Sequence, residues 1–265
     1  MIINRLKFYK KKFTPWYRND YKKFLSLNLH NNDFEIKDNF PCIKDKFLQS
    51  GEIKSGHYFL QDIYMAREIY KAHPVKHVDI GSRIDGFIAH LAVFREVEVF
   101  DIRSLNISDK NIIFTQADLT KVDEKFMEYT DSISCLHTLE HFGLGRYGDE
   151  IDPEGHLKGF EVITYILKPS GKFYFSVPIG KNRIEFNAHR VFSLSYLLSW
   201  VTKRYEIVKF SYIDDNNLMA PNSISLVQIS RAIFNRFKSI QSRPSKVTFI
   251  NLSINRLDYP ITSFL

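Results

Sequence analysis

Cysteine is scarce in this sequence, and the only two, Cys42 and Cys135, lie far apart and in no metal-ligand spacing. The sequence therefore predicts neither a disulfide framework nor a structural zinc site, and it favours a reducing, cytoplasmic location. It also lacks the run of about 18 uncharged apolar residues that a membrane span needs. The N-terminus has no uninterrupted apolar stretch of the signal-peptide kind.

Acidic residues are nearly missing from the N-terminal segment. Residues 1–24 hold eight basic side chains against one acid, Asp20, which accounts for the formal net charge of +7 and leaves a neutral remainder. A neutral body lacks the broad basic face that duplex binding requires, so we expect no nucleic-acid partner. The basic segment, in which aromatic residues alternate with lysines, is either a solvated extension or a contact for a membrane surface or an acidic partner.

In the rest of the chain, segments with the hydrophobic spacing of a helix alternate with short apolar runs typical of strands. Phe59, Ile63, Ala66 and Tyr70 recur at spacings of three or four, which predicts a helix over 57–72. Short apolar runs then predict strands at 77–80, 96–100, 111–115, 131–136, 172–177 and 205–210, with helices at 87–94, 155–167 and 193–201 and a sharp turn at 168–171. This alternation predicts an α/β fold, a doubly wound, mostly parallel Rossmann-like sheet.

The two ends of the chain stand outside that alternation. Residues 1–50 are polar, aromatic and irregular, and we expect an arm or cap there, followed by a ligand-binding domain over 51–265 with its core at 57–212. Strands at 224–229 and 247–254 and a helix at 231–240 are compatible with either an antiparallel hairpin that completes the sheet or a lid over the site.

Three aspartates follow three successive predicted strands. Asp79, in the pattern Asp79-x-Gly81-x4-Gly86, belongs to the first, Asp101 ends the second, and Asp118 lies just beyond the third. Ligands of doubly wound sheets bind beyond the carboxyl ends of the strands. A glycine permits a tight turn there, and an acid at the spacing of Asp101 accepts hydrogen bonds from ribose hydroxyls. Asp118 could accept one from an exocyclic amino group.

The first loop lacks the glycines of G-x-G-x-x-G, which a dinucleotide needs to seat its pyrophosphate at a helix N-terminus. Arg83 and Asp85 occupy the loop instead, and Asp85 would repel a pyrophosphate. S-adenosylmethionine carries no phosphate and has a sulfonium cation, so this loop favours it over a nicotinamide cofactor.

Six segments carry a resemblance: HVDIGSRIDGF, VEVFDIR, FTQADLT, DSISCLHTLEHFG, LKPSGKFYFSVPIG and HRVFSLSYLL. In this order, over residues 57–212, they resemble the class I S-adenosylmethionine-dependent methyltransferases. They are most similar to a bacterial branch of unknown function that is associated with surface-polysaccharide genes. The resemblance implies S-adenosylmethionine as cofactor, S-adenosylhomocysteine as product and a small-molecule acceptor. The cofactor-binding residues that it implies are Asp79, Gly81, Ser82, Gly86, Asp101, Ile102, Asp118, Leu119, Leu136 and His137, with Tyr58 and Gln61 at the methionyl end.

Candidate bases follow the fourth and fifth predicted strands. His141 paired with Glu140 is the first choice for proton removal and His189 the second, although each has a structural alternative, in loop ordering or capping. Arg146, with its neighbour Tyr147, and Arg190 are candidates for holding an anionic acceptor group. We expect no metal, because the only conceivable set, His137, His141, Asp149 and Asp152, matches no metal-binding signature.

The expected reaction is O-methylation of a small polar metabolite, a sugar or a phosphorylated intermediate, with the surface-glycan context coming from the resemblance alone. Methylation of nucleic-acid bases is disfavoured, since CLHTLEH contains none of the prolines that hold a planar amino group in those enzymes. Two alternatives stay open, a non-catalytic scaffold that binds S-adenosylmethionine and a nicotinamide-dependent oxidoreductase. The sequence predicts no oligomeric state.

Overall fold

The computed structural model describes residues 14–27, 36–37, 42–43, 56–213, 219–222 and 248–257. The chain divides into two compact units, Met1–Lys54 and Ser55–Leu265. The first contains helix α2 (Pro15–Leu27), which begins with proline at the position where a missing N–H does no harm. Most of the basic segment, and the strand and helix predicted at 224–229 and 231–240, lie outside the described residues.

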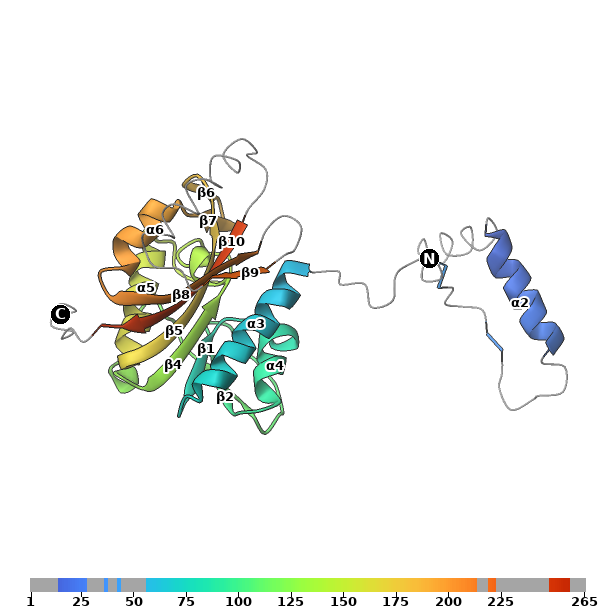
Figure 1. The fold of residues 1–265 in the computed structure, drawn as a ribbon, viewed down its shortest axis with the longest axis horizontal. Coiled ribbons are helices and arrows are strands. Elements are labelled where there is room, and N and C mark those ends of the chain that lie inside the picture. Colours follow the sequence, from blue (N-terminus) through green and yellow to red (C-terminus); the bar gives the residue numbers. More distant parts are fainter. Residues whose placement is uncertain are drawn as a thin grey trace. The chain divides into compact units, whose positions relative to one another are not determined.

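The second unit is built on one twisted sheet (Figure 1). Its strands are β1 (His77–Ile80), β2 (Val97–Asp101), β3 (Ile112–Gln116), β4 (Thr130–Leu136), β5 (Leu167–Ile179), β8 (Tyr205–Ile213), β9 (Met219–Asn222) and β10 (Thr248–Arg256). They lie in the order β3-β2-β1-β4-β5-β10-β8-β9, and the first five pair in parallel. The order reverses between β1 and β4, where doubly wound sheets form their ligand crevice.

Helices cover both faces of this sheet (Figure 1). Helix α3 (Gly56–Ala72) and the short α4 (Ala89–Ala92) pack on one face, where Val97 and Val99 of β2 join their apolar cluster. Helices α5 (Gly155–Ile166) and α6 (Leu194–Val201) pack on the other face, with Phe100. Neighbouring residues of β2 thus point to opposite faces, as the period of two in a strand requires.

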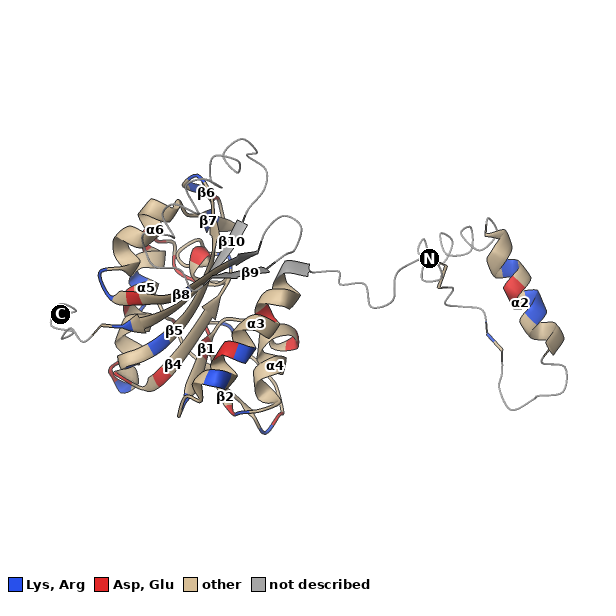
Figure 2. Cartoon of the chain, viewed as in Figure 1, with Lys and Arg blue, Asp and Glu red and all other residues tan. Residues whose placement is uncertain are grey.

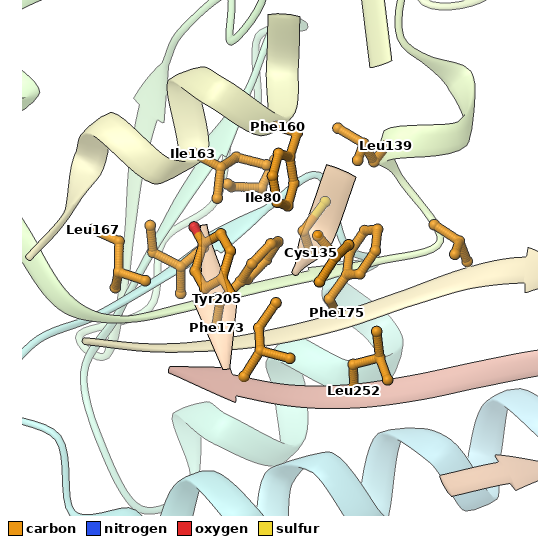
Figure 3. Close-up of a cluster of buried hydrophobic side chains, with 14 of the residues drawn as sticks. Ile80, Cys135, Leu139, Phe160, Ile163, Leu167, Phe173, Phe175, Tyr205 and Leu252 are labelled. Atoms are coloured by element: carbon orange, nitrogen blue, oxygen red, sulfur yellow. The ribbon is translucent and has the colours of Figure 1, made fainter. Parts of the chain in front are cut away.

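The larger core lies under α5 and α6 (Figure 3). Phe173 and Phe175 of β5 are fully buried there beside Phe160 of α5 and Tyr205 of β8, and Leu252 of β10 contributes from the strand next to β5. Burial of each such side chain stabilises the fold by about 1.5–3 kcal/mol. This core fixes the strand ends that carry the site.

The predicted fold class is confirmed, and the C-terminal strand completes the sheet, because β10 pairs antiparallel with both β5 and β8. The turn predicted at 168–171 is wrong as a strand boundary. Thr130 faces Leu167 whereas Ser132 faces Lys172, so the extra residues form an irregularity within β5, with Ser170 at φ +59°. A short hairpin of β6 (Arg183–Glu185) and β7 (His189–Val191) was not predicted.

Acidic and basic residues of this unit are intermingled along its elements (Figure 2), in keeping with a neutral body. No helix within the described ranges is both long and apolar enough to cross a membrane.

Candidate functional site

A cavity of about 770 Å³ opens at the carboxyl ends of β1, β2 and β4, beside the point where the strand order reverses. This volume lies within the range of about 300–1,000 Å³ typical of small-molecule sites. Of the residues predicted from the sequence, fifteen line it: Tyr58, Gly81, Ser82, Gly86, Asp101, Ile102, Asp118, Leu119, Leu136, His137, Glu140, His141, Arg146, Tyr147 and His189. Asp79, Gln61 and Arg190 do not.

The loop after β1 is held from beneath by Asp79. This carboxylate is fully buried and accepts hydrogen bonds from the amide (3.0 Å) and hydroxyl (2.9 Å) of Ser82 and from the hydroxyl of Ser134 (2.5 Å). Gly81 then turns at φ +66°, and a Cβ there would lie 2.6 Å from the methyl group of Thr138. Asp79 therefore shapes the loop from one layer below, while Gly81 brings backbone to the cavity wall.

Asp101 and Asp118 both reach the cavity, and both already have partners. The side chain of Arg103 donates to the two oxygens of Asp101 at 3.0 and 2.8 Å. Asp118 accepts from the amide (3.0 Å) and hydroxyl (2.6 Å) of Thr120. Partial burial raises the pKa of Asp118, but these bonds and Lys121 outweigh it and leave the pKa below its ordinary value. Two anionic carboxylates thus stand at the ends of neighbouring strands.

Helix α3 supplies one wall of the cavity. Gln61 is buried behind it and its Oε1 lies 2.8 Å from Nε2 of His137, which holds a left-handed backbone (φ +55°) at the end of β4. The rings of Tyr58 and His137 meet edge to face, with their centroids 4.8 Å apart. Burial, and then the charge of Glu140, raises the pKa of Tyr58. Gln61 therefore orients His137 and contributes no surface to the cavity.

Asp62, on the same helix, lines the cavity and was missed in the sequence. Its position four residues after Tyr58 places both on one helix face, which is the signal that could have found it. Burial, and then the nearby Asp79, raises its pKa from 3.8 to about 7. Gly86 leaves room for it, since a Cβ on Gly86 would lie 3.1 Å from a carboxylate oxygen of Asp62.

The raised pKa of Asp62 predicts a pH-dependent gain in stability for Asp62→Asn. The folded state holds this proton more tightly than the unfolded state, so ionisation destabilises the fold progressively as pH rises from about 4 to 7. Solvent beside the half-buried carboxylate screens most of this penalty, and we expect a gain of about 1 kcal/mol, or about 2–4 °C in Tm, at pH 8 and less than half of that gain at pH 5. Differential scanning fluorimetry at both pH values measures it. Exposed Asp109, changed to Asn, is the control; equal melting temperatures of wild type and Asp62→Asn at pH 8 would contradict the assignment.

His141 and Glu140 lie in the short helix η4 (Leu139–His141) after β4. Nδ1 of His141 lies 2.5 Å from the carbonyl oxygen of Ala188. A carbonyl only accepts, so Nδ1 carries the proton and Nε2 of the neutral ring carries the lone pair. Burial lowers the pKa of His141 below 6.5, in spite of the opposing charge of Glu140. His141 is therefore a neutral, oriented imidazole at the cavity wall, the form that a general base needs.

Glu140 is 2% exposed, and one of its oxygens lies 3.8 Å from Nδ1 of His137. Its other oxygen, Oε2, is buried without a hydrogen-bond partner among the described residues. A buried carboxylate oxygen without a donor is costly, so Glu140 is held in this place at the expense of stability. His189, at the start of β7, lines the same cavity near His141.

Arg190 departs from its expected role as an anion contact. It is 3% exposed and outside the cavity, and its guanidinium donates to the backbone oxygens of Phe142, Asp152 (3.2 Å) and Pro153 (3.1 Å). It therefore ties the loop between β4 and α5 to the β6–β7 hairpin. Arg146, by contrast, is exposed at the cavity, and it donates to the oxygen of Ala188 at 3.0 Å.

The helix that follows the first loop does not offer a pyrophosphate site. Residues Ile84–Ile88 form a π-helical turn, η2, in which Gly86 (φ −121°, ψ −107°) leaves the helical region. The helix predicted at 87–94 is thus reduced to this turn and α4. The pyrophosphate of a dinucleotide is bound in this place by aligned N–H groups at a helix N-terminus. Arg83 and Asp85 pair with each other at the rim, at 3.0 Å.

Within the described part of the chain, no group of three or more histidine, cysteine, aspartate or glutamate side chains is arranged to hold a metal ion. The set considered above includes Asp149 and Asp152, and these have other partners. Asp149 accepts from the amides of Gly145 and Tyr147, and Asp152 pairs with Lys158.

The profile of one protein family, described as "Caenorhabditis protein of unknown function, DUF268", matches residues 93–238, more than half of the chain. The chain belongs to this family. The matched part of this DUF268 protein includes Asp101, Asp118, the HTLEH segment and Arg146, whereas β1 and its loop precede it. No curated protein matches the sequence significantly.

Several solved structures resemble the DUF268 protein in fold. A putative sarcosine dimethylglycine methyltransferase from Galdieria sulphuraria is 13% identical, with a TM-score of 0.48 over 75% of this chain and 86% of that one. The N-methyltransferase NodS from Bradyrhizobium japonicum, in complex with S-adenosylhomocysteine, is 13% identical, with a TM-score of 0.47 over 89% and 98%. The cyclase SpnF is 10% identical, with a TM-score of 0.47 over 69% and 75%. At this distance they identify no functional residue of this chain.

Proposed function

We propose that this protein is an S-adenosylmethionine-dependent methyltransferase that transfers a methyl group to a hydroxyl of a small polar metabolite, a sugar or a phosphorylated intermediate. One observation carries the proposal. Asp101 and Asp118, from the ends of neighbouring strands, meet in one cavity with the Gly81 turn and with His141. An acceptor from surface-polysaccharide synthesis, in the cytoplasm, is the finer form of the proposal, and it rests on the sequence resemblance.

The cavity fits an adenosyl ligand in shape and charge. Asp101 would accept the ribose hydroxyls and Asp118 the adenine amino group, while apolar Phe100, Ile102 and Leu119 border the space between them. The distorted η2 turn disfavours a pyrophosphate, which supports a phosphate-free cofactor over a nicotinamide dinucleotide. Asp62, which titrates near neutral pH, adds negative charge to the same cavity.

The residues beside this space can carry out the acceptor chemistry. When bound, the cofactor would supply a methyl group on a positively charged sulfur. Nε2 of His141 would take the proton of the acceptor hydroxyl, and the oxygen would accept the methyl group while the methyl–sulfur bond breaks and the sulfur leaves as the neutral thioether of S-adenosylhomocysteine. Glu140, with one oxygen 3.8 Å from Nδ1 of His137, would help to hold the His137 ring at the cavity wall. Alignment of this kind supplies about 7–11 kcal/mol in favourable cases.

Calorimetric titration with S-adenosylhomocysteine and NAD⁺ tests the cofactor. We expect binding of the first and none of the second. Asp101→Ala should weaken S-adenosylhomocysteine by about tenfold or more, because a charge-assisted hydrogen bond contributes about 1.5–3 kcal/mol. Exposed Asp109→Ala is the matched control. If the wild type does not bind S-adenosylhomocysteine, the proposal is rejected. If it binds this ligand but forms no S-adenosylhomocysteine from S-adenosylmethionine with any acceptor of a panel, the non-catalytic scaffold is favoured.

A further inference from the structure

The acid proposed to hold the ribose is engaged by a side chain of the same chain. Arg103 donates through its backbone N–H and Nε to one oxygen of Asp101 (2.8 and 3.0 Å) and through Nη2 to the other (2.8 Å). A ribose diol approaches a carboxylate in the same paired manner as a guanidinium. The two therefore compete for the same positions on Asp101.

Arg103 also reaches the acceptor side of the cavity. Its guanidinium lies over the ring of Tyr147, 4.3 Å from the centroid, and that of Arg146 lies over the same ring at 5.1 Å. The rings of Tyr147 and His141 meet edge to face at 5.5 Å. Two cationic groups are thus collected by one aromatic ring directly beside the proposed base.

Other carboxylates near this part of the cavity have partners of their own. Asp149 accepts from two backbone amides of its own loop, and Asp118 and Glu150 both face Lys121. Of the acids around Tyr147, Asp101 is the one that neutralises Arg103. If the ribose takes Asp101, the Arg103 guanidinium loses its carboxylate partner and, with that of Arg146, stays over the Tyr147 ring as a cation available to a phosphate group.

We propose that Arg103 and Arg146 form a phosphate-binding subsite for the acceptor, and that Asp101 masks this subsite until ribose hydroxyls displace Arg103. The inference rests on the proposed function, because the displacing group belongs to the adenosyl cofactor. It makes binding ordered, with the cofactor first. It also assigns to Arg103 the anion contact that the sequence had suggested for Arg190.

The test uses the full chain and inorganic phosphate as the probe, titrated at constant ionic strength with and without saturating S-adenosylhomocysteine. We expect phosphate to bind at least fivefold more tightly in its presence, within the range of about 5–150-fold seen for coupled sites. Thermodynamic reciprocity requires phosphate to tighten S-adenosylhomocysteine by the same factor.

Three variants sharpen the result. Arg103→Gln should bind S-adenosylhomocysteine about threefold or more tightly in phosphate-free buffer, because the competitor is gone, and should lose the phosphate coupling. Arg103→Lys keeps the positive charge but loses the paired N–H donors of the guanidinium, and it should retain part of the phosphate binding. Arg146→Gln should weaken phosphate binding at least fivefold and leave the affinity for S-adenosylhomocysteine unchanged. The control is Arg183→Gln, which removes a comparable pair, Arg183–Glu185, outside the cavity.

The subsite is overturned if phosphate affinity is the same with and without S-adenosylhomocysteine, or if Arg103→Gln retains the phosphate affinity of the wild type. Weaker S-adenosylhomocysteine binding by Arg103→Gln overturns the displacement. Both results leave the proposed function standing. Failure of the wild type to bind S-adenosylhomocysteine is a different outcome, and it removes the proposed function together with this inference.

Discussion

Replacing His141 by glutamine is expected to lower turnover by about 10²–10⁴-fold, the contribution of a positioned general base. Glutamine keeps a neutral polar side chain at this position while the basic nitrogen is lost. S-adenosylhomocysteine affinity should change little, because the proposal assigns the binding of that ligand to Asp101 and Asp118. Turnover is measured as S-adenosylhomocysteine release with the best acceptor from a panel of sugars and sugar phosphates.

The pH dependence separates proton removal from a structural role. Burial keeps the pKa of His141 below 6.5, so the wild type should lose activity only as pH falls below that value and the imidazole takes up a proton. The residual activity of His141→Gln should lack this acidic limb. His73→Gln, a change outside the cavity, is the control. An unaltered acidic limb in His141→Gln would assign the base to another residue, with His189 next in line.

The strand ends of the site were predictable because they follow from local patterns. A buried parallel strand is a short apolar run, and the residue that follows it lies at the crevice by topology alone. Asp101, Asp118 and Gly81 were found in this way. The same reasoning placed Asp79 in the cavity, although its side chain lies one layer below it. Spacing along the chain does not show which way a side chain points at the end of a strand.

The residues that sequence reasoning missed depend on contacts between distant segments. Arg190 is the middle residue of a three-residue strand, and nothing local indicates that the carbonyls it meets belong to a loop 37 to 50 residues away. Arg103 follows Asp101 by two residues, and only the Tyr147 ring, supplied by a distant loop, distinguishes it from other exposed arginines. Asp62 is one polar residue on an amphipathic helix, and only its burial beside Asp79 gives it a distinctive pKa.

The C-terminal strand shows the same limit at the level of the fold. Its apolar run predicted β10 within two residues of its observed bounds, but the run could not say whether the strand joins the sheet or a lid. Insertion between β5 and β8 is decided by pairing on both sides, with β10 running antiparallel to each of them. Such pairing over long sequence separation has no local signature.

The largest expected change in stability comes from replacing Arg190 by methionine, which keeps much of the side-chain volume and removes the donors. The carbonyl oxygens of Phe142, Asp152 and Pro153 would then lose a charged partner inside the protein. Each unsatisfied buried group costs about 1–3 kcal/mol, so we expect the free energy of unfolding to fall by about 3–5 kcal/mol, as measured by urea denaturation.

The loop cannot easily recover by closing on itself. Gly143 and Asp152 already approach closely at its neck, where the amide of Asp152 donates to the oxygen of Gly143 at 2.9 Å and a Cβ on Gly143 would collide with the oxygen of Asp152. Arg204→Met, which removes a partly exposed ion pair with Glu161, should cost less than about 1 kcal/mol and serves as the control. Since the loop pinned by Arg190 carries Arg146 and Tyr147, Arg190→Met should also weaken phosphate binding without touching the adenosyl side. A variant as stable as the control would mean that water replaces the guanidinium at these carbonyls and that the loop holds its own shape.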